Sequence, residues 1–277
     1  MSKITAAQVN ELRQKTGAGM MDCKKALVEA EGDFEKATDI LRKKGQKLAS
    51  SRAERKANEG VVLSTVDAGS QKAFAVMLNC ETDFVAQNQE VIDFAQAILD
   101  LAVEKGCDNL ETLRELDMNG RSVQENITDM IGKTGEKMEL GGFGVVKGEK
   151  AFAYTHPGNK IAAIAALNKS DVSDIDVVGK DVVMQIAAMA PVALSKDDVD
   201  PAIIDKEIEI GKEQARQEGK PEQLLEKIAM GKLNKFFKES TLLSQDFIKD
   251  SKKTVSQMLQ AADKDLTVVD FRRLSLV

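Results

Sequence analysis

The spacing of apolar residues changes near residue 60, and this change constrains the fold more than any other feature of the sequence. Between residues 5 and 45, apolar side chains recur every three to four positions, which is typical of amphipathic helices. Gly17 and Gly19 interrupt this pattern, and Gly32 interrupts it again. The segment therefore predicts three short helices that end before Gly45 and form a compact but marginal bundle.

Beyond residue 60 the pattern becomes that of strands. Two strand-like apolar runs, 61–66 and 73–78, predict a strand hairpin. A long helix from Thr82 to about Glu104 is predicted to follow, and a shorter helix covers 122–133.

The same plan then recurs in the second half of the chain. Strand patterns occupy 138–147, 150–155 and 160–167, and a helical pattern covers 180–190. A repeated hairpin-then-helix plan favours an α+β fold with a core of two related α+β subdomains. We place their boundaries at residues 60–140 and 141–277.

Residues 201–239 carry two narrow apolar stripes on either side of Gly219-Lys220-Pro221. Glycine commonly ends a helix and proline commonly begins one, so the pattern predicts an antiparallel helical hairpin inserted into the second subdomain. The hairpin either projects from the core or lies flat on it, and the pattern allows both arrangements.

Charge distinguishes the N-terminal segment from the rest of the chain. Residues 1–56 hold 13 Lys and Arg against 8 Asp and Glu, although the net charge of the chain is −6. Most of this excess lies in the basic tract of residues 42–56, and we interpret 46–59 as a basic linker. The alternative is a nucleic-acid or ribosome-associated binding protein that uses the basic tract.

Residue types that perform catalysis or bind metals are scarce. One histidine, His156, argues against a catalytic triad and a histidine-based metal site. The stretch 131–134 looks like the end of a phosphate-binding loop, but Ile127 stands where that loop needs glycine. The composition therefore favours a protein that works by contact, is not an enzyme and binds no nucleotide itself. The three cysteines are too far apart for a zinc site and are expected to be reduced and buried: Cys23, Cys80 and Cys107.

Nothing in the sequence points to a membrane. No run of about 18 apolar residues occurs, so we expect no membrane-spanning segment. The N-terminal residues lead into a helical pattern without an apolar signal core, and we expect a cytoplasmic protein.

Two stretches carry a specific resemblance to a known family. They are residues 16–27, TGAGMMDCKKAL, and residues 79–86, NCETDFVA. Both resemble signature segments of bacterial elongation factor Ts, the guanine-nucleotide exchange factor of elongation factor Tu. The stretch from Gly219 to Phe236 resembles the coiled-coil region of that family. The segments occur in the same order, so the resemblance covers essentially the whole chain.

This resemblance implies a fold and an activity. The implied fold has a ubiquitin-associated-like three-helix domain over residues 1–45, a core of two α+β subdomains and an inserted antiparallel coiled coil. The implied activity is binding to the GDP form of elongation factor Tu and release of the nucleotide. It also implies no cofactor and no covalent chemistry. We expect no contact with nucleic acid.

The resemblance further implies contact residues for elongation factor Tu. In the segment of Thr82, Asp83, Phe84 and Val85, the Phe84 ring would insert between helices of the GTPase domain, and Asp83 would make a polar contact. The residue pattern alone also allows Phe84 to pack into the core of its own chain. The remaining implied contacts are Met20, Met21, Arg13, Lys24, Ile131, Gly132, His156 and Gln185.

Two of these contacts can be argued further from the sequence. Adjacent residues on a helix point about 100° apart, so at least one of Met20 and Met21 is expected to be exposed. Gln185 stands where the family usually has a histidine, and its amide can still donate and accept hydrogen bonds.

Overall fold

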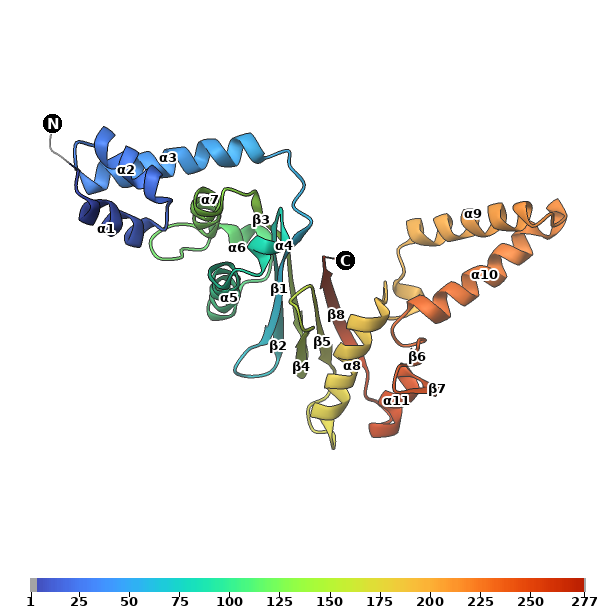
Figure 1. Cartoon of the computed structure of the whole chain (residues 1–277). Helices are drawn as coiled ribbons and strands as arrows, with labels where there is room; N and C mark the ends of the chain where they lie inside the picture. Colours follow the sequence, from blue (N-terminus) through green and yellow to red (C-terminus); the bar gives the residue numbers. More distant parts are fainter. Residues whose placement is uncertain (1–3, 277) are drawn as a thin grey trace. The chain divides into compact units, whose positions relative to one another are not determined.

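The structure of the chain, a computed structural model, describes residues 4–276 and divides them into two units (Figure 1). The first unit contains the residues up to Leu63, together with Val76–Phe143 and Leu276. The second unit contains Ser64–Ala75 and Gly144–Ser275. The fold is α+β, as predicted, with helices and small antiparallel sheets. Among residues 4–276, no helix combines the length and the hydropathy needed to cross a bilayer.

Three helices form the N-terminal part of the first unit, which confirms that prediction. They are α1 (Ala6–Thr16), α2 (Met20–Glu29) and α3 (Phe34–Arg52). A capping box between Thr5 and Gln8 begins α1, and Gly17 ends it in a left-handed conformation with φ of 67°. Their buried side chains form a separate cluster, made of Val9, Leu12, Cys23, Ala26, Leu27, Ala30 and Ala37.

The third helix is longer than its sequence pattern predicts. We expected it to end before Gly45, but α3 continues through this glycine to Arg52. Residues 46–52, which the sequence indicates as the start of a linker, therefore form its last two turns. Gly45 is buried against helix α7 (Val123–Thr134), where a side chain would meet the backbone of Thr128 and Gly132. The glycine thus serves a close helix contact and not a helix end.

A sheet of three strands comes next in sequence, with the strand order β1-β2-β3. The strands are β1 (Glu59–Val66), β2 (Lys72–Cys80) and β3 (Met138–Lys147). The predicted strand hairpin is confirmed, and both of its strands are slightly longer than expected.

Between β2 and β3 the chain forms α4 (Asp83–Ala86), α5 (Gln89–Glu104), α6 (Leu110–Glu115) and α7. The prediction of one long helix from Thr82 to Glu104 is wrong, because the helix is interrupted after α4. The side chain of Asn88 accepts a hydrogen bond from the backbone N–H of Glu90 and thereby begins a new helix. The short helix α6 is not predicted by the sequence pattern.

A second antiparallel sheet, in the order β4-β5-β8, forms the core of the second unit. Its strands are β4 (Lys150–Thr155), β5 (Ile161–Leu167) and β8 (Val268–Ser275). Helix α8 (Ile175–Met189) packs on β4 and β5, and α11 (Val255–Ala262) packs on α8. A small strand pair, β6 (Asp246–Phe247) and β7 (Asp250–Thr254), precedes α11.

The predicted helical hairpin consists of α9 (Pro201–Gln217) and α10 (Leu225–Ser240), which run in opposite directions (Figure 1). Gly211 allows close approach, since a Cβ there would lie 3.2 Å from the Cβ of Ala229. The two helices pack mainly on each other. Among the described elements, the short 3-10 helix η2 (Glu222–Leu224), which lies between them in sequence, also packs on α10. This packing favours a hairpin that does not lie flat on the core.

Candidate functional site

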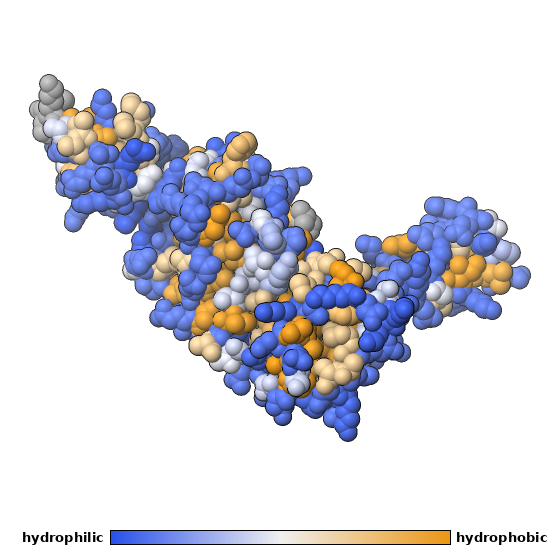
Figure 2. All heavy atoms as spheres, turned by 60° about the horizontal axis from the view of Figure 1, so that its bottom comes forward, coloured by the Kyte–Doolittle hydropathy of each residue, from blue (hydrophilic) through white to orange (hydrophobic). Residues whose placement is uncertain are grey.

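Phe84 is more exposed than any other large apolar side chain that the structure describes. Its exposed fraction is 85 %. Figure 2 shows one face of the molecule, on which apolar residues lie among a mostly hydrophilic surface. Because 85 % of its side chain is exposed, Phe84 does not pack into the core of its own chain, and that alternative is wrong. An aromatic ring left in water offers a partner a large area of apolar contact.

The backbone around Phe84 forms a single helical turn, which we call the Phe84 turn (residues 82–86). Thr82 has an extended conformation and caps α4, and its hydroxyl accepts a hydrogen bond from the N–H of Val85 at 3.4 Å. Ala86 is buried beneath the turn, whereas Asp83 and Phe84 lie on its exposed side. The cap and the buried alanine together direct the Phe84 side chain outward.

Cys80, at the end of β2, stabilises the Phe84 turn through a hydrogen bond. Its buried thiol donates a hydrogen bond to the carbonyl oxygen of Thr82 at 3.1 Å. Burial raises the pKa of this thiol to about 12, with a further contribution from the nearby charge of Glu136. Cys80 is thus a protonated hydrogen-bond donor. Cys23 and Cys107 are likewise free and buried, so the prediction of three reduced thiols is confirmed.

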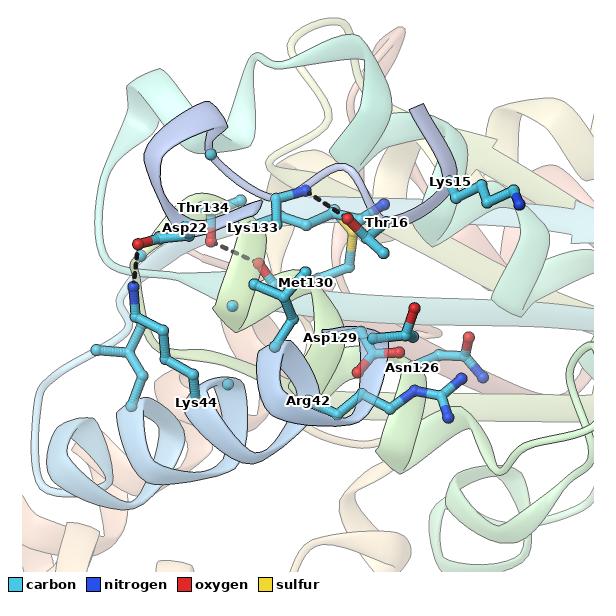
Figure 3. A pocket seen from close by; sticks show the side chains of 18 of the residues that line it. Lys15, Thr16, Asp22, Arg42, Lys44, Asn126, Asp129, Met130, Lys133 and Thr134 are labelled. Carbon is cyan, nitrogen blue, oxygen red and sulfur yellow. Dashed lines mark hydrogen bonds and ion pairs between the residues drawn. The ribbon is translucent and has the colours of Figure 1, made fainter. Parts of the chain in front are cut away.

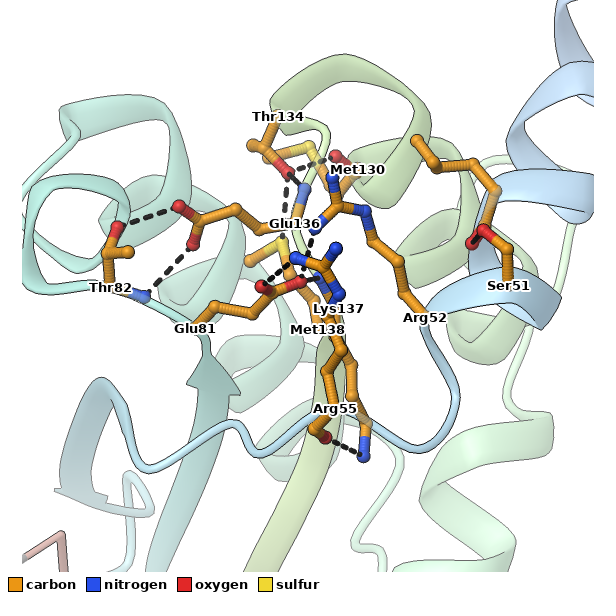
Figure 4. Close-up of polar contacts among 11 residues, drawn as sticks. Ser51, Arg52, Arg55, Glu81, Thr82, Met130, Thr134, Glu136, Lys137 and Met138 are labelled. Carbon is orange, nitrogen blue, oxygen red and sulfur yellow. Dashed lines mark hydrogen bonds and ion pairs between the residues drawn. The ribbon is translucent and has the colours of Figure 1, made fainter.

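Glu136 holds the Thr82 cap from another part of the first unit (Figure 4). One carboxylate oxygen accepts from the Thr82 N–H at 3.0 Å, and the other accepts from the Thr82 hydroxyl at 2.7 Å. Glu136 lies in the turn between α7 and β3, directly after Gly135, which ends α7 with φ of 77°. Both donors of Thr82 are therefore fixed by a single carboxylate.

Glu81, the neighbouring residue, is bound by three groups from two segments of the chain (Figure 4). Its carboxylate accepts from Arg52 at 2.9 Å, from Arg55 at 3.0 Å and from the N–H of Lys137 at 2.6 Å. Burial alone would raise the pKa of Glu81, but the Lys137 N–H and the two guanidinium groups lower it to about 2. Two cations of the basic tract therefore form internal ion pairs.

The start of α2 presents two adjacent apolar side chains to solvent. Met20 is 56 % exposed and Met21 is 61 % exposed, so both are on the surface where at least one was expected. Arg13 and Lys24 are also exposed, and neither makes an ion pair with another residue in the range 4–276. A flexible thioether pair beside unpaired cations suits contact with a partner protein.

Ile131 and Gly132 lie inside the first unit. Ile131 is buried, and Gly132 faces Gly45 of α3. The expectation that Ile131 contacts a partner is contradicted, because its side chain is enclosed by its own chain. Gly132 contributes to the packing of α7 on α3.

A cavity of about 440 Å³ lies between the N-terminal helices and α7 (Figure 3). Four basic residues line it, but each has an acidic partner within the chain. Lys44 pairs with Asp22, Lys133 pairs with Glu90, Lys15 with Glu11 and Arg42 with Asp39. With its cations paired in this way, the cavity has no evident means of holding a phosphate group.

The second unit contains the other two expected contact residues. His156 is exposed in the turn between β4 and β5, and its Nδ1 lies 2.8 Å from the hydroxyl of Tyr154. Gln185 is fully buried in α8. Its amide donates to Gln245 and to the carbonyl of Asp246, and it accepts from the N–H of Ile248 at 2.8 Å.

The expectation that Gln185 contacts a partner is therefore contradicted. It has no exposed surface, and its amide satisfies backbone groups of the segment that forms β6 and directly follows it.

Comparison with known proteins decides the family. The family model described as Elongation factor TS matches residues 81–276. The protein named Elongation factor Ts of Cytophaga hutchinsonii is 52 % identical over all 277 residues and over its own full length. The proteins of the same name from Amoebophilus asiaticus and Porphyromonas gingivalis are 49 % identical. The first alignment covers 98 % of both chains, and the second covers 99 % of this chain and 98 % of its relative.

The chain belongs to the elongation factor Ts family. Its role is that of the guanine-nucleotide exchange factor of elongation factor Tu, which is its partner in translation elongation. The alternative of a nucleic-acid-binding protein is not supported, and the ion pairs of Arg52 and Arg55 with Glu81 explain part of the basic tract by internal contacts.

Sequence reasoning missed two residues of this elongation factor Ts chain that bind the Phe84 turn and the residue before it. Glu136 lies 54 positions after Thr82, and Lys137 lies 56 positions after Glu81. Neither pair follows a helical or strand period, so only the tertiary structure brings them together. Gly135 was the one local signal, because a glycine after a helical pattern predicts a turn there.

Proposed function

We propose that the chain releases GDP by inserting Phe84 into the GTPase domain of elongation factor Tu. The observation that carries this proposal is the 85 % exposure of a phenylalanine on a turn held by internal hydrogen bonds. Leaving such a ring in water is unfavourable for the free protein, and burying it in a partner recovers that free energy.

Exchange requires the factor to bind nucleotide-free elongation factor Tu better than the GDP-bound form. A factor with equal affinity for both forms would shift nothing, and the weakening of GDP and of the factor is reciprocal. A wedge near the magnesium site of the partner achieves this difference, because Mg²⁺ tolerates little displacement of its ligands. In this proposal Asp83 supplies the polar contact beside the wedge, and Thr82 and Val85 complete the surface.

A second contact surface lies on the three N-terminal helices. Met20 and Met21 supply apolar area, and the unpaired cations Arg13 and Lys24 supply charge at its edge. We place a third contact at His156 in the second unit, where Tyr154 orients the imidazole. The protein then acts by binding alone, performs no covalent chemistry and holds no cofactor.

The finer architecture follows the family. We propose that the three N-terminal helices form a ubiquitin-associated-like domain, and that α9 and α10 form an antiparallel coiled coil within 201–239. The remaining core then comprises two subdomains, at about 60–140 and 141–277. The role of the protein in translation elongation also favours a cytoplasmic location.

Release of fluorescent GDP from elongation factor Tu, followed by stopped flow, tests the proposal. The wild-type chain should accelerate release in proportion to its concentration below saturation. Phe84→Ala should slow release at least about tenfold, which corresponds to roughly 1.4 kcal/mol. Its thermal midpoint should stay close to that of the wild type, because an exposed ring contributes little to its own core. Normal exchange by Phe84→Ala would refute the wedge.

A further inference from the structure

The Phe84 ring makes little contact with the rest of its own chain. It is 85 % exposed, so its direction in the free protein is set by the backbone of the Phe84 turn. Helix α4 has only four residues. A single helical turn is unstable in isolation, since forming it fixes several dihedral angles in return for one hydrogen bond. Other groups of the chain must therefore hold the turn in its conformation.

A backbone hydrogen bond from the Ala86 N–H to the Thr82 carbonyl at 3.2 Å closes the turn, and the side-chain cap of Thr82 is a weaker restraint. The Val85 N–H lies 3.4 Å from the Thr82 hydroxyl oxygen, which is long for a helix cap. The two bonds from Thr82 to Glu136 are shorter, at 3.0 and 2.7 Å, and both are to a carboxylate. Hydrogen bonds to a charged acceptor are roughly twice as strong as neutral ones. Glu136 is thus the stronger restraint on the cap.

Glu136 is itself held in place by the turn on which it lies (Figure 4). Its backbone N–H donates to the Thr134 hydroxyl at 3.3 Å, and the next N–H, of Lys137, donates to Glu81 at 2.6 Å. Consecutive residues of this turn therefore bind consecutive residues of the strand end: 137 binds Glu81, and 136 binds Thr82. Of the two carboxylates, only that of Glu136 touches the cap of α4.

We infer that Glu136 is a positioning residue for nucleotide exchange, which fixes the Phe84 turn before elongation factor Tu binds. This inference rests on the proposed role of Phe84. Because the turn is already ordered in the free chain, binding does not have to reduce its conformational entropy further. Without the Glu136 carboxylate the ring is still present, but the free chain samples other directions for it.

A double-mutant cycle on the full chain tests this inference by GDP release from elongation factor Tu. Glu136→Ala should lower kcat/KM for release roughly tenfold, as expected for the loss of two hydrogen bonds to a charged group. In the Phe84→Ala background the same change should have little effect, because no ring remains to be positioned. Glu136→Gln, which keeps one acceptor oxygen for Thr82, should recover part of the lost activity.

Glu139→Ala is the matched control. It removes the same charge from the same strand end, at an exposed residue that pairs with Lys137 and does not touch Thr82. It should exchange nucleotide as the wild type does. Thermal midpoints show whether each variant is folded, and Glu136→Gln carries the test if Glu136→Ala is unfolded.

The outcomes distinguish the inference from the proposed function. Equal losses from Glu136→Ala in both backgrounds would mark a general structural role and overturn the inference, and so would normal exchange by both Glu136 variants. In either case a slow Phe84→Ala would leave the wedge proposal standing. Normal exchange by Phe84→Ala would overturn both.

Discussion

Gly45 of α3 faces Gly132 of α7 so closely that a Cβ built on Gly132 would lie 3.4 Å from the Cα of Gly45. Side chains normally keep helix axes 8–10 Å apart, and a pair of glycines permits a closer approach. The long third helix of the N-terminal bundle is therefore packed directly on the rest of the first unit. The N-terminal helices are joined to this unit by a packed interface as well as by the chain itself.

Enlarging Gly45 should separate these two helices. Gly45→Leu should lower the free energy of unfolding by about 1–3 kcal/mol through overpacking, and a lower thermal midpoint would show it. Gly45→Ala is the matched control. Its Cβ would lie no closer than 3.4 Å to another atom, and alanine favours a helix, so its midpoint should be unchanged or slightly higher. A Gly45→Leu chain as stable as the wild type would show that the interface is loose.

Removing the thioethers of α2 should weaken binding without affecting folding. The double variant Met20→Ala, Met21→Ala should lose roughly tenfold in affinity for elongation factor Tu, measured by titration calorimetry. Because both side chains are largely exposed, the thermal midpoint should change little. Val28→Ala alters an exposed residue near the other end of α2 and should bind normally. Unchanged affinity of the double variant would remove α2 from the contact surface.

Gln185→Leu should act on stability and not on recognition. It leaves the N–H of Ile248 and the carbonyl of Asp246 without the buried amide that binds them, at a cost of about 1–3 kcal/mol. Chemical denaturation would measure this loss, and exchange by the folded molecules should be normal. The opposite pattern, with wild-type stability and weak binding, would restore Gln185 as a partner contact.

The Glu81 ion pairs should make stability depend on acid. The pKa of Glu81 is lowered from 4.5 to about 2 in the folded chain, so the unfolded chain binds its proton first as the pH falls. The stabilisation is complete above pH 4.5 and is lost between that pH and about 2. The difference in free energy of unfolding between the wild type and Glu81→Gln should therefore shrink over this interval. A difference that stays constant down to pH 2 would contradict the assignment.

Local sequence signals predicted most elements of this fold, and long-range contacts account for the errors. Thr5 and Gln8 are a local signal for the start of α1, because a capping box involves only neighbouring residues. Gly45 misled the prediction, since its reason lies in Gly132 and not in the end of a helix. Asn88 caps a helix inside a pattern that is apolar on both sides, and the break was therefore missed.

The candidate site shows the same limit. The signature segment located Phe84, but the residue pattern allowed both a buried and an exposed ring, and only the structure distinguishes them. The helical periodicity around Gln185 does not show whether this position is buried or exposed. Its burial follows from the segment around β6, which no periodic pattern had indicated.

The pairing of Thr82 with Glu136 also has a consequence for synthesis of the chain. Because the two residues are 54 positions apart, a growing polypeptide cannot form this clamp until residue 136 has emerged from the ribosome. The buried cluster of the N-terminal helices lies within residues 9–37 and can form well before then. Under the proposed mechanism, a nascent chain would expose its methionine pair early and acquire a fixed phenylalanine late, so that an incomplete chain would bind elongation factor Tu without efficiently releasing its GDP.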